Sequence, residues 1–237
     1  MYANQVAMKS RRARKSPQLS LRLPRPKSKP TWGGRRAGAG RKSATGRRGM
    51  SHRVRPELDA RLPLHVTLRL TPRTFSLRSG RAMRQVEASL RGGAHRFGVR
   101  IVQVSVQGNH LHCLVEAPDK VALSSAVKGL GVRLARRMNS LMGTQGRVLA
   151  DRYHARALRT PTEVKNAIHY LRHNHRHHHG AHFLPSAWVD PCSSDARDFG
   201  LPAPTTWLLR IGWQRGRISS THLAALHAGD SSAHLHF

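Results

Sequence analysis

The segment from Gly108 to Glu116, Gly-Asn-His-Leu-His-Cys-Leu-Val-Glu, restricts the fold of this chain more than any other segment. It predicts a turn followed by a β-strand, and successive side chains of a strand point to opposite faces of its sheet. His110 and His112 therefore share one face. The other face carries Leu111, Cys113 and Val115. Because neutral imidazole is the commonest metal-ligating side chain, this strand predicts a core on one side and half of a divalent-metal site on the other.

Periodicity predicts seven secondary-structure elements between residues 62 and 180. Apolar and polar residues alternate in the expected strands, and apolar residues recur every three to four positions in the expected helices. The elements are a strand at 64–70, a helix at 77–92, a strand at 97–106, the histidine strand, a helix at 121–142, a strand at 147–158 and a helix from 161 to about 175. The first six match the split βαβ, or ferredoxin-like, arrangement. We therefore expect an α+β fold with an antiparallel sheet, two helices on one face, and an open face unless the last helix covers it.

Two local signals refine this pattern. Val102, Val104 and Val106 follow the two-residue period of a strand and are expected on one face. Thr160 before Pro161 predicts where the last helix begins, because Thr is a favoured N-cap and Pro a favoured first helical residue.

The net charge of +31 and the pI of about 12.0 limit the partners of the chain. Arginine supplies most of this charge, and its guanidinium binds phosphate in a bidentate manner. A nucleic acid is therefore the expected partner, and a ribosome-like structural role and an anionic membrane are the alternatives.

No apolar run reaches the roughly 18 residues of a spanning helix, and the first residues lack the apolar core of a signal peptide. The two cysteines, Cys113 and Cys192, make no disulfide framework, so a reducing cytoplasm fits.

The flanking segments differ from the central region. Residues 1–60 contain 17 Lys and Arg against two acidic residues, with many Pro, Gly and Ser, and such a segment cannot offset its ordering entropy by apolar burial. We expect a disordered basic arm there, whose candidate DNA contacts are Arg35, Arg36 and Arg41. Residues 181–237 are expected to form a partly loose C-terminal extension, in which an apolar island at 207–213 docks onto the domain.

The helix expected after residue 161 carries Tyr170 and Asn174 on one face, because residues four apart are neighbours on a helix. A tyrosine hydroxyl, with a pKa of about 10, is a poor nucleophile at neutral pH. A divalent cation assists such a nucleophile by polarising the phosphate under attack. His110, His112 and Asn174 would supply two nitrogens and one oxygen to that cation, which suits Mg²⁺ or, with imidazole ligands, Mn²⁺.

Several residues near this constellation have two interpretations. Tyr153 competes with Tyr170 as the nucleophile, or stacks on a base. Tyr170 is preferred because a helix can swing toward and away from a metal and because Asn174 shares its face. His65 is either a group that contacts the metal ligands without binding the metal, or a surface histidine. Glu116 is either a ligand or the partner of a nearby arginine.

These residues resemble those of the single-tyrosine HUH transposases of bacterial insertion sequences, and above all the REP-associated branch. The resemblance covers residues 62–180. It is carried by His110-Leu111-His112, by Tyr170 with Asn174, and by Asp151-Arg152-Tyr153-His154, which is similar to the Arg-Tyr-His strand of REP-associated members. The chain departs from that branch where His175 stands in place of a common Pro, and where Val148-Leu149-Ala150 lacks a common aromatic residue.

The resemblance implies a catalytic palm domain at 62–180 that cuts single-stranded or hairpin DNA. Tyr170 would attack a phosphodiester, hold a 5′-phosphotyrosine link and release a 3′-hydroxyl, and another 3′-hydroxyl would resolve the link. It further implies a bacterial, nucleoid-associated cytoplasmic protein that acts as a monomer or a homodimer. The candidate DNA contacts within and around this domain are Arg152, Arg156, Arg159, Lys128 and Arg133.

Other functions fit the same residues. The chain could be a domesticated relative that binds hairpin DNA or RNA and does not cut it. It could also be a structural RNA-binding protein, or, within the enzymes, a replication initiator or relaxase.

Overall fold

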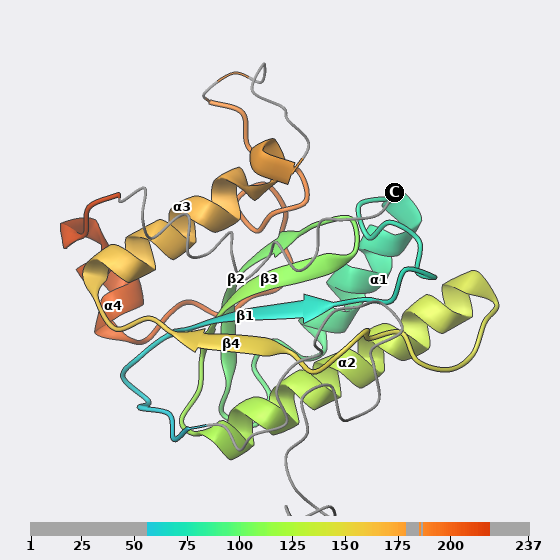
Figure 1. Ribbon diagram of the computed structural model, residues 1–237, viewed down its shortest axis with the longest axis horizontal. Coiled ribbons are helices and arrows are strands. Elements are labelled where there is room, and N and C mark those ends of the chain that lie inside the picture. Colours follow the sequence, from blue (N-terminus) through green and yellow to red (C-terminus); the bar gives the residue numbers. More distant parts are fainter. Residues whose placement is uncertain (1–55, 179–184, 186, 219–237) are drawn as a thin grey trace, which may run out of the picture. The chain divides into compact units, whose positions relative to one another are not determined.

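Two neighbouring strands, β1 (Leu64–Arg69) and β3 (His110–Glu116), form the centre of a four-stranded antiparallel sheet (Figure 1). The edge strands are β2 (Arg100–Val106) and β4 (His154–Ala157), and the strand order is β2-β3-β1-β4. The helices are α1 (Gly80–Arg91), α2 (Lys120–Met142), α3 (Pro161–His178) and α4 (Trp207–Arg210), followed by the 3-10 helix η1 (Gly212–Arg215). The order of the first seven elements and the sheet confirm the expected α+β fold.

This computed structural model describes residues 56–178, 185 and 187–218. Nearly all of the expected basic arm lies outside the described residues, and with it Arg35, Arg36 and Arg41. Among the described residues, no helix has both the length and the apolar character that a membrane span requires.

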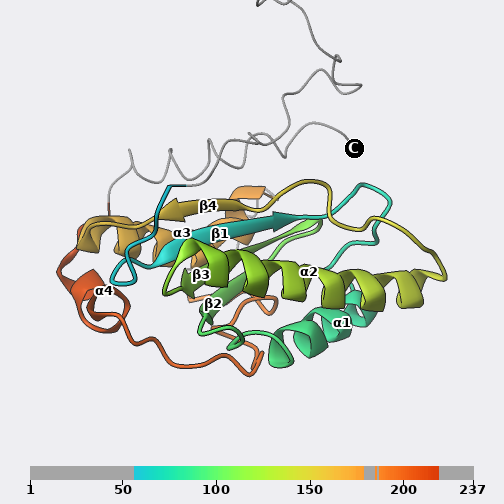
Figure 2. The same cartoon turned by 90° about the horizontal axis from the view of Figure 1, so that it is seen from below.

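One face of the sheet is covered by α1 and α2, which lie side by side (Figure 2). The apolar stripe of α1 is buried, as expected from the spacing of Met83, Val86 and Leu90, and α2 buries Leu130 and Leu134 in the same core. The Asp119 carboxylate caps α2 by accepting hydrogen bonds from Val121 N at 2.7 Å and Ala122 N at 2.8 Å. The helix ends at Gly143, whose φ of +64° is a left-handed conformation that glycine adopts at little cost.

The expected pattern of β2 is wrong at one residue. Val104 and Val106 belong to the core under α1 and α2, whereas Val102 packs against the cluster on the opposite face. The cause is a register shift between Ile101 and Gln103, which pair with consecutive residues of β3. A β-bulge of this kind inserts one residue and reverses the alternation on the far side of it.

The strand expected at 147–158 is interrupted. Leu149 forms only an isolated bridge with Leu70, and the paired strand β4 begins at His154. Between them the chain bends at Asp151, whose Oδ1 accepts a hydrogen bond from the next backbone N–H at 2.7 Å. A side chain that satisfies the local backbone in this way competes with strand pairing.

The opposite face of the sheet is covered by α3, which lies against β2 and β3. The helix begins with a capping box, because Thr160 Oγ1 accepts from Glu163 N at 3.2 Å and Glu163 Oε2 accepts from Thr160 N at 3.3 Å. Its apolar residues form a second buried cluster with Leu114 of β3 and with Leu208 and Leu209 of α4. The apolar island near residue 207 is therefore docked on α3.

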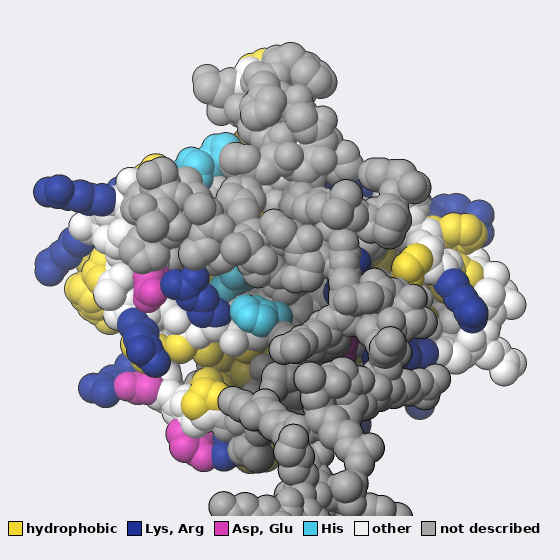
Figure 3. All heavy atoms as spheres, viewed as in Figure 1, with side chains coloured by type: hydrophobic (Ala, Val, Ile, Leu, Met, Phe, Trp, Pro, Cys, Tyr) yellow, Lys and Arg dark blue, Asp and Glu magenta, His cyan; other side chains and the backbone are white. Residues whose placement is uncertain are grey.

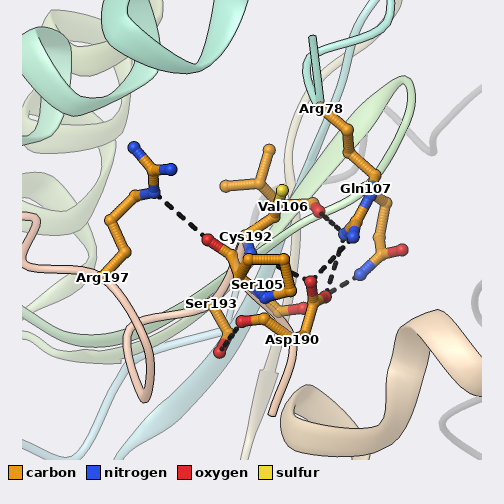
Figure 4. A network of polar contacts seen from close by, with 9 residues as sticks. Arg78, Ser105, Val106, Gln107, Asp190, Cys192, Ser193 and Arg197 are labelled. Carbon is orange, nitrogen blue, oxygen red and sulfur yellow. Dashed lines mark hydrogen bonds and ion pairs between the residues drawn. The ribbon is translucent and has the colours of Figure 1, made fainter. Parts of the chain in front are cut away.

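Residues 190–206 hold this arrangement together by polar contacts, of which Figure 4 shows those around Asp190. The fully buried Asp190 carboxylate accepts two hydrogen bonds from Arg78, at 2.7 and 2.9 Å. Val106 N donates to Cys192 O at 2.9 Å, and Ser194 N donates to Val104 O at 2.9 Å. The segment thus pairs with the exposed edge of β2, which would otherwise be open to another chain.

Candidate active site

The two histidines of β3 project from the face that α3 covers, as the strand pattern predicts. His110 and His112 are 3% and 1% exposed, and their neighbours at 111, 113 and 115 belong to the core on the other side. In the sheet His112 pairs with Thr67 on one side and with Ser105 on the other. Strands β1, β3 and β2 therefore form a polar surface beneath α3, which we call the polar floor.

The imidazoles of this floor are held by their neighbours. The ring centroids of His110 and His112 lie 4.7 Å apart with perpendicular planes. His112 Nδ1 lies 3.1 Å from His65 Nε2 and 3.2 Å from Thr67 Oγ1, and His110 Nδ1 lies 2.8 Å from Asn109 Oδ1. Partners on Nδ1 fix the orientation of a ring and make Nε2 the nitrogen that it offers to a metal.

Tyr170 lies directly over this floor. Its ring is 5.2 Å from the ring of His112 and 5.9 Å from that of His65, edge to face in both cases. It is 0% exposed and belongs to the apolar cluster of α3 and α4. The competing Tyr153 packs against the core under α1 and α2, on the other side of the sheet. Of the two tyrosines, only Tyr170 is next to the histidines.

Asn174 provides the clearest sign that this face suits a metal. It follows Tyr170 by one helical turn, is 0% exposed, and neither Oδ1 nor Nδ2 has a hydrogen-bond partner within the described residues. A buried amide without partners costs about 1–3 kcal/mol, and a metal ion bound to Oδ1 would satisfy that atom. No three His, Cys, Asp or Glu side chains of the described chain form a metal site. The donor set that fits is two imidazoles and this amide oxygen, which suits Mg²⁺ or Mn²⁺.

His65 belongs to the site, and the surface interpretation of this residue is wrong. It is 4% exposed, and its ring stacks on that of His112 with centroids 5.2 Å apart. The sequence contained a signal, because His65 and Thr67 are two positions apart, as His110 and His112 are, and so share one face of their strand. This spacing indicates that both side chains lie on the same face of β1, but it does not indicate which strand pairs with β1.

The candidate DNA contacts divide between the two faces of the sheet. Arg156 pairs with His65 across β1 and β4, so it shares the face of the site, and its Nη2 donates to Glu163 Oε1 at 3.1 Å. Arg159 and Arg152 are exposed near the two ends of β4. Lys128 and Arg133 belong to α2, so the structure does not bring them to the histidines.

Glu163, which receives these arginine hydrogen bonds, is held ionised. Burial raises its pKa, but the hydrogen bonds from Arg159 N and the Arg156 guanidinium lower it more, and the net direction is downward. The carboxylate therefore ties the beginning of α3, the helix that carries Tyr170, to β4.

Glu116 is not near the metal donors. Burial raises its pKa, but its carboxylate accepts hydrogen bonds from the backbone and hydroxyl groups of Thr206 and Thr205, at 2.7–2.9 Å, and the net direction is downward. The expected arginine partner is present as Arg100, at a longer 3.7 Å. Glu116 therefore anchors the segment that leads into α4.

Comparison with known proteins gives one family. Residues 60–174 match the sequence family described as "Transposase IS200 like". Among solved structures, a REP-associated tyrosine transposase bound to a REP hairpin is 18% identical, with a TM-score of 0.48, over 72% of this chain and 100% of the other. A candidate transposase from Deinococcus radiodurans R1 is 20% identical, with a TM-score of 0.35, over 48% of this chain and 87% of the other. No curated protein matches.

Proposed function

Through residues 60–174 the chain belongs to the family of IS200-like transposases, and from this premise we propose that it is a metal-dependent DNA nickase and strand transferase whose nucleophile is Tyr170. One observation supports this most directly. Tyr170 lies over the His112 and His65 rings, and one turn later on the same helix follows the buried amide of Asn174, which has no hydrogen-bond partner in the described part of the chain.

The reaction is an exchange of phosphoester bonds. The Tyr170 hydroxyl loses its proton, its oxygen bonds to the phosphorus of a single strand, and the bond from phosphorus to the 3′ oxygen breaks. The strand keeps a 5′-phosphotyrosine link, and the leaving oxygen takes up a proton as a free 3′-hydroxyl. Attack by another 3′-hydroxyl reverses the same steps and joins two strands without hydrolysis.

His110, His112 and Asn174 are the residues that would hold a divalent cation. A bound Mg²⁺ or Mn²⁺ supplies positive charge to the phosphate oxygens as negative charge develops on them. His65 and Thr67 position His112 by their contacts with Nδ1. The apolar neighbours of Tyr170 exclude water, which favours transfer to a 3′-hydroxyl over hydrolysis.

The substrate we propose is hairpin DNA with a single-stranded portion. The net charge of +31 favours a polyanion, and Lys and Arg side chains are spread over the described surface (Figure 3). Because Tyr170 is fully buried, whatever covers its side chain has to move before a strand reaches the hydroxyl. The same burial favours one second candidate function, a hairpin-binding protein in which Tyr170 is only a packing residue.

A nicking assay distinguishes the two functions. Full-length protein is incubated with Mn²⁺ and a 3′-labelled hairpin oligonucleotide, because the 3′ segment of the cut strand is the one that stays linked to the tyrosine. Covalent protein–DNA adducts are then separated on a denaturing gel. We expect an adduct in wild type and in Tyr153→Phe, and none in Tyr170→Phe. An adduct in Tyr170→Phe would reject Tyr170 as the nucleophile. Tight hairpin binding without any adduct, in wild type as well, would establish the second function.

A further inference from the structure

Gln107 directly follows the last residue of β2 and is buried, with 1% of its surface exposed. Its backbone N–H donates to His110 O at 2.8 Å, which continues the register in which Ser105 pairs with His112. Residues paired across two antiparallel strands have neighbouring side chains on one face of the sheet. Val106, which lies between the two, belongs to the core under α1 and α2. Gln107 and Ser105 therefore share the face of the two histidines.

The side-chain amide of Gln107 is satisfied at only one of its two polar atoms. Nε2 donates to Ser105 Oγ at 2.9 Å, whereas Oε1 is buried and has no hydrogen-bond partner within the described residues. Figure 4 shows the amide nitrogen turned toward the contacts around Asp190 and the oxygen turned away from them. Because the two atoms belong to one planar group, the bond to Ser105 also fixes where the oxygen points.

The cation of this network, Arg78, does not satisfy the oxygen. Its guanidinium donates to the Asp190 carboxylate at 2.7 and 2.9 Å and to Val106 O at 2.9 Å. The positive charge is therefore balanced by a buried carboxylate. A buried acceptor that is left unpaired costs about 1–3 kcal/mol, so Gln107 Oε1 is suited to a positively charged partner from outside the chain.

Two buried amide oxygens have this property in common. Gln107 Oε1 and Asn174 Oδ1 come from different elements, and neither has a hydrogen-bond partner in the described part of the chain. Gln107 lies on the sheet face that α3 covers, and Asn174 lies on α3, which packs against β2 and β3. Amide carbonyl oxygens are hard, neutral donors of the kind that Mg²⁺ and Mn²⁺ bind.

We propose that Gln107 is a fourth protein ligand of the divalent cation, and that its Oε1 binds the ion beside His110. The proposal rests on the proposed function, because it takes from it the cation held by His110, His112 and Asn174. Two imidazole nitrogens and two amide oxygens would then share the ion, and all four donors are neutral. A ligand set without carboxylates leaves the ion its full double charge, with which it attracts phosphate oxygens.

The test is Mn²⁺ binding to the full-length protein without DNA, measured from the electron paramagnetic resonance signal of the free ion. Gln107→Met removes both polar atoms of the amide at similar volume. Ser105→Ala is the matched control, because it removes the same hydrogen bond and keeps the amide oxygen. His112→Ala is the reference for a missing ligand, and Gln107→Glu keeps an oxygen at the same position.

Gln107→Met should bind Mn²⁺ at least about tenfold more weakly than wild type, since even residues that only support metal ligands contribute about 10- to 100-fold. Ser105→Ala should lose less, and Gln107→Glu should bind at least as tightly as wild type because it adds a negative charge. Wild-type affinity in Gln107→Met, or an equal loss in Ser105→Ala, would overturn the proposal. If Gln107→Met does not fold, an affinity of Gln107→Glu below that of wild type would overturn it.

Thermal unfolding with and without Mn²⁺ distinguishes a ligand from a structural residue. In the metal-free protein, Gln107→Met loses the same hydrogen bond as Ser105→Ala but also removes an unpaired buried acceptor, so its Tm should not be the lower of the two. At equal concentration, Mn²⁺ should raise the Tm of wild type more than that of Gln107→Met, because stabilisation by a ligand follows its affinity. A lower metal-free Tm with an equal response to Mn²⁺ would make Gln107 a structural residue and overturn the proposal.

The outcome is separable from that of the proposed function. Weaker Mn²⁺ binding in His112→Ala with unchanged binding in Gln107→Met would overturn the fourth ligand and leave the metal site. Mn²⁺ binding that depends on Gln107, in a wild type that forms no covalent adduct with DNA, would support the ligand and reject the nickase. A wild type that binds Mn²⁺ no better than His112→Ala would overturn the metal site and the fourth ligand together.

Discussion

The two faces of the β1–β3 pair come from the same strands and have opposite chemistry. Toward α1 and α2, β3 contributes Leu111, Cys113 and Val115 to an apolar core. Toward α3, the alternate residues of β3 are mostly polar, and all are buried to a similar extent. A strand that is buried on both faces is usually apolar throughout.

This difference indicates which side of the sheet is optimised for stability and which for chemistry. Burial of polar groups costs free energy unless they are paired. Among the described residues, the α3 face contains imidazoles and an amide without a hydrogen-bond partner, whereas the apolar cluster under α1 and α2 contains neither. Substitutions of neighbouring residues that lie on opposite faces therefore separate the two roles.

The largest effect is expected from His112→Ala. Loss of a ligand should reduce nicking more than the roughly 10- to 100-fold that is typical for residues that support ligands, and His65→Ala should fall within that range. Leu111→Ala, on the other face, should lower the free energy of unfolding by about 2–5 kcal/mol with unchanged nicking per folded molecule. Adduct yields and urea unfolding of the three variants are measured together. A Leu111→Ala protein that folds fully but no longer nicks would contradict the division between faces.

A smaller effect is expected from Glu116→Gln, which tests how the C-terminal segment is attached. Hydrogen bonds to a charged group contribute about 1.5–3 kcal/mol, and the folded-state pKa of Glu116 is lowered. Its stabilising contribution is therefore complete above the unfolded pKa of about 4.3 and is lost as the pH falls through the lower folded value. Urea unfolding between pH 3 and 6 should show this loss in wild type and a smaller one in Glu116→Gln. Identical pH profiles would reject the carboxylate as an anchor.

The smallest effect is expected from thiol chemistry on the core face. Burial raises the pKa of Cys113 to about 12, so the thiol stays protonated and unreactive at pH 8. Iodoacetamide followed by mass spectrometry should leave Cys113 unmodified in the folded protein and modify it in urea. Rapid modification of the folded protein would show that the apolar face opens more readily than its packing indicates.

The sequence was sufficient for features that depend on local periodicity. The alternation in β3 gave the face of His110 and His112, the apolar stripe gave the buried side of α1, and Thr160 with Pro161 gave the beginning of α3. It failed where a single backbone irregularity changed the period, at the bulge beside Val102 and at the bend at Asp151. Such irregularities depend on the pairing partner, which alternation does not encode.

What the sequence alone determined is therefore the kind of domain, its basic character and the residue types of the site. Only the tertiary structure decided which residues meet: that His65 lies against His112, that Tyr170 rather than Tyr153 faces the histidines, and that Glu116 anchors residues 205 and 206. The physical reason is that a strand or helix fixes only the direction of its own side chains. Contact between segments that are 40 to 100 residues apart depends on sheet order, register and the placement of α3.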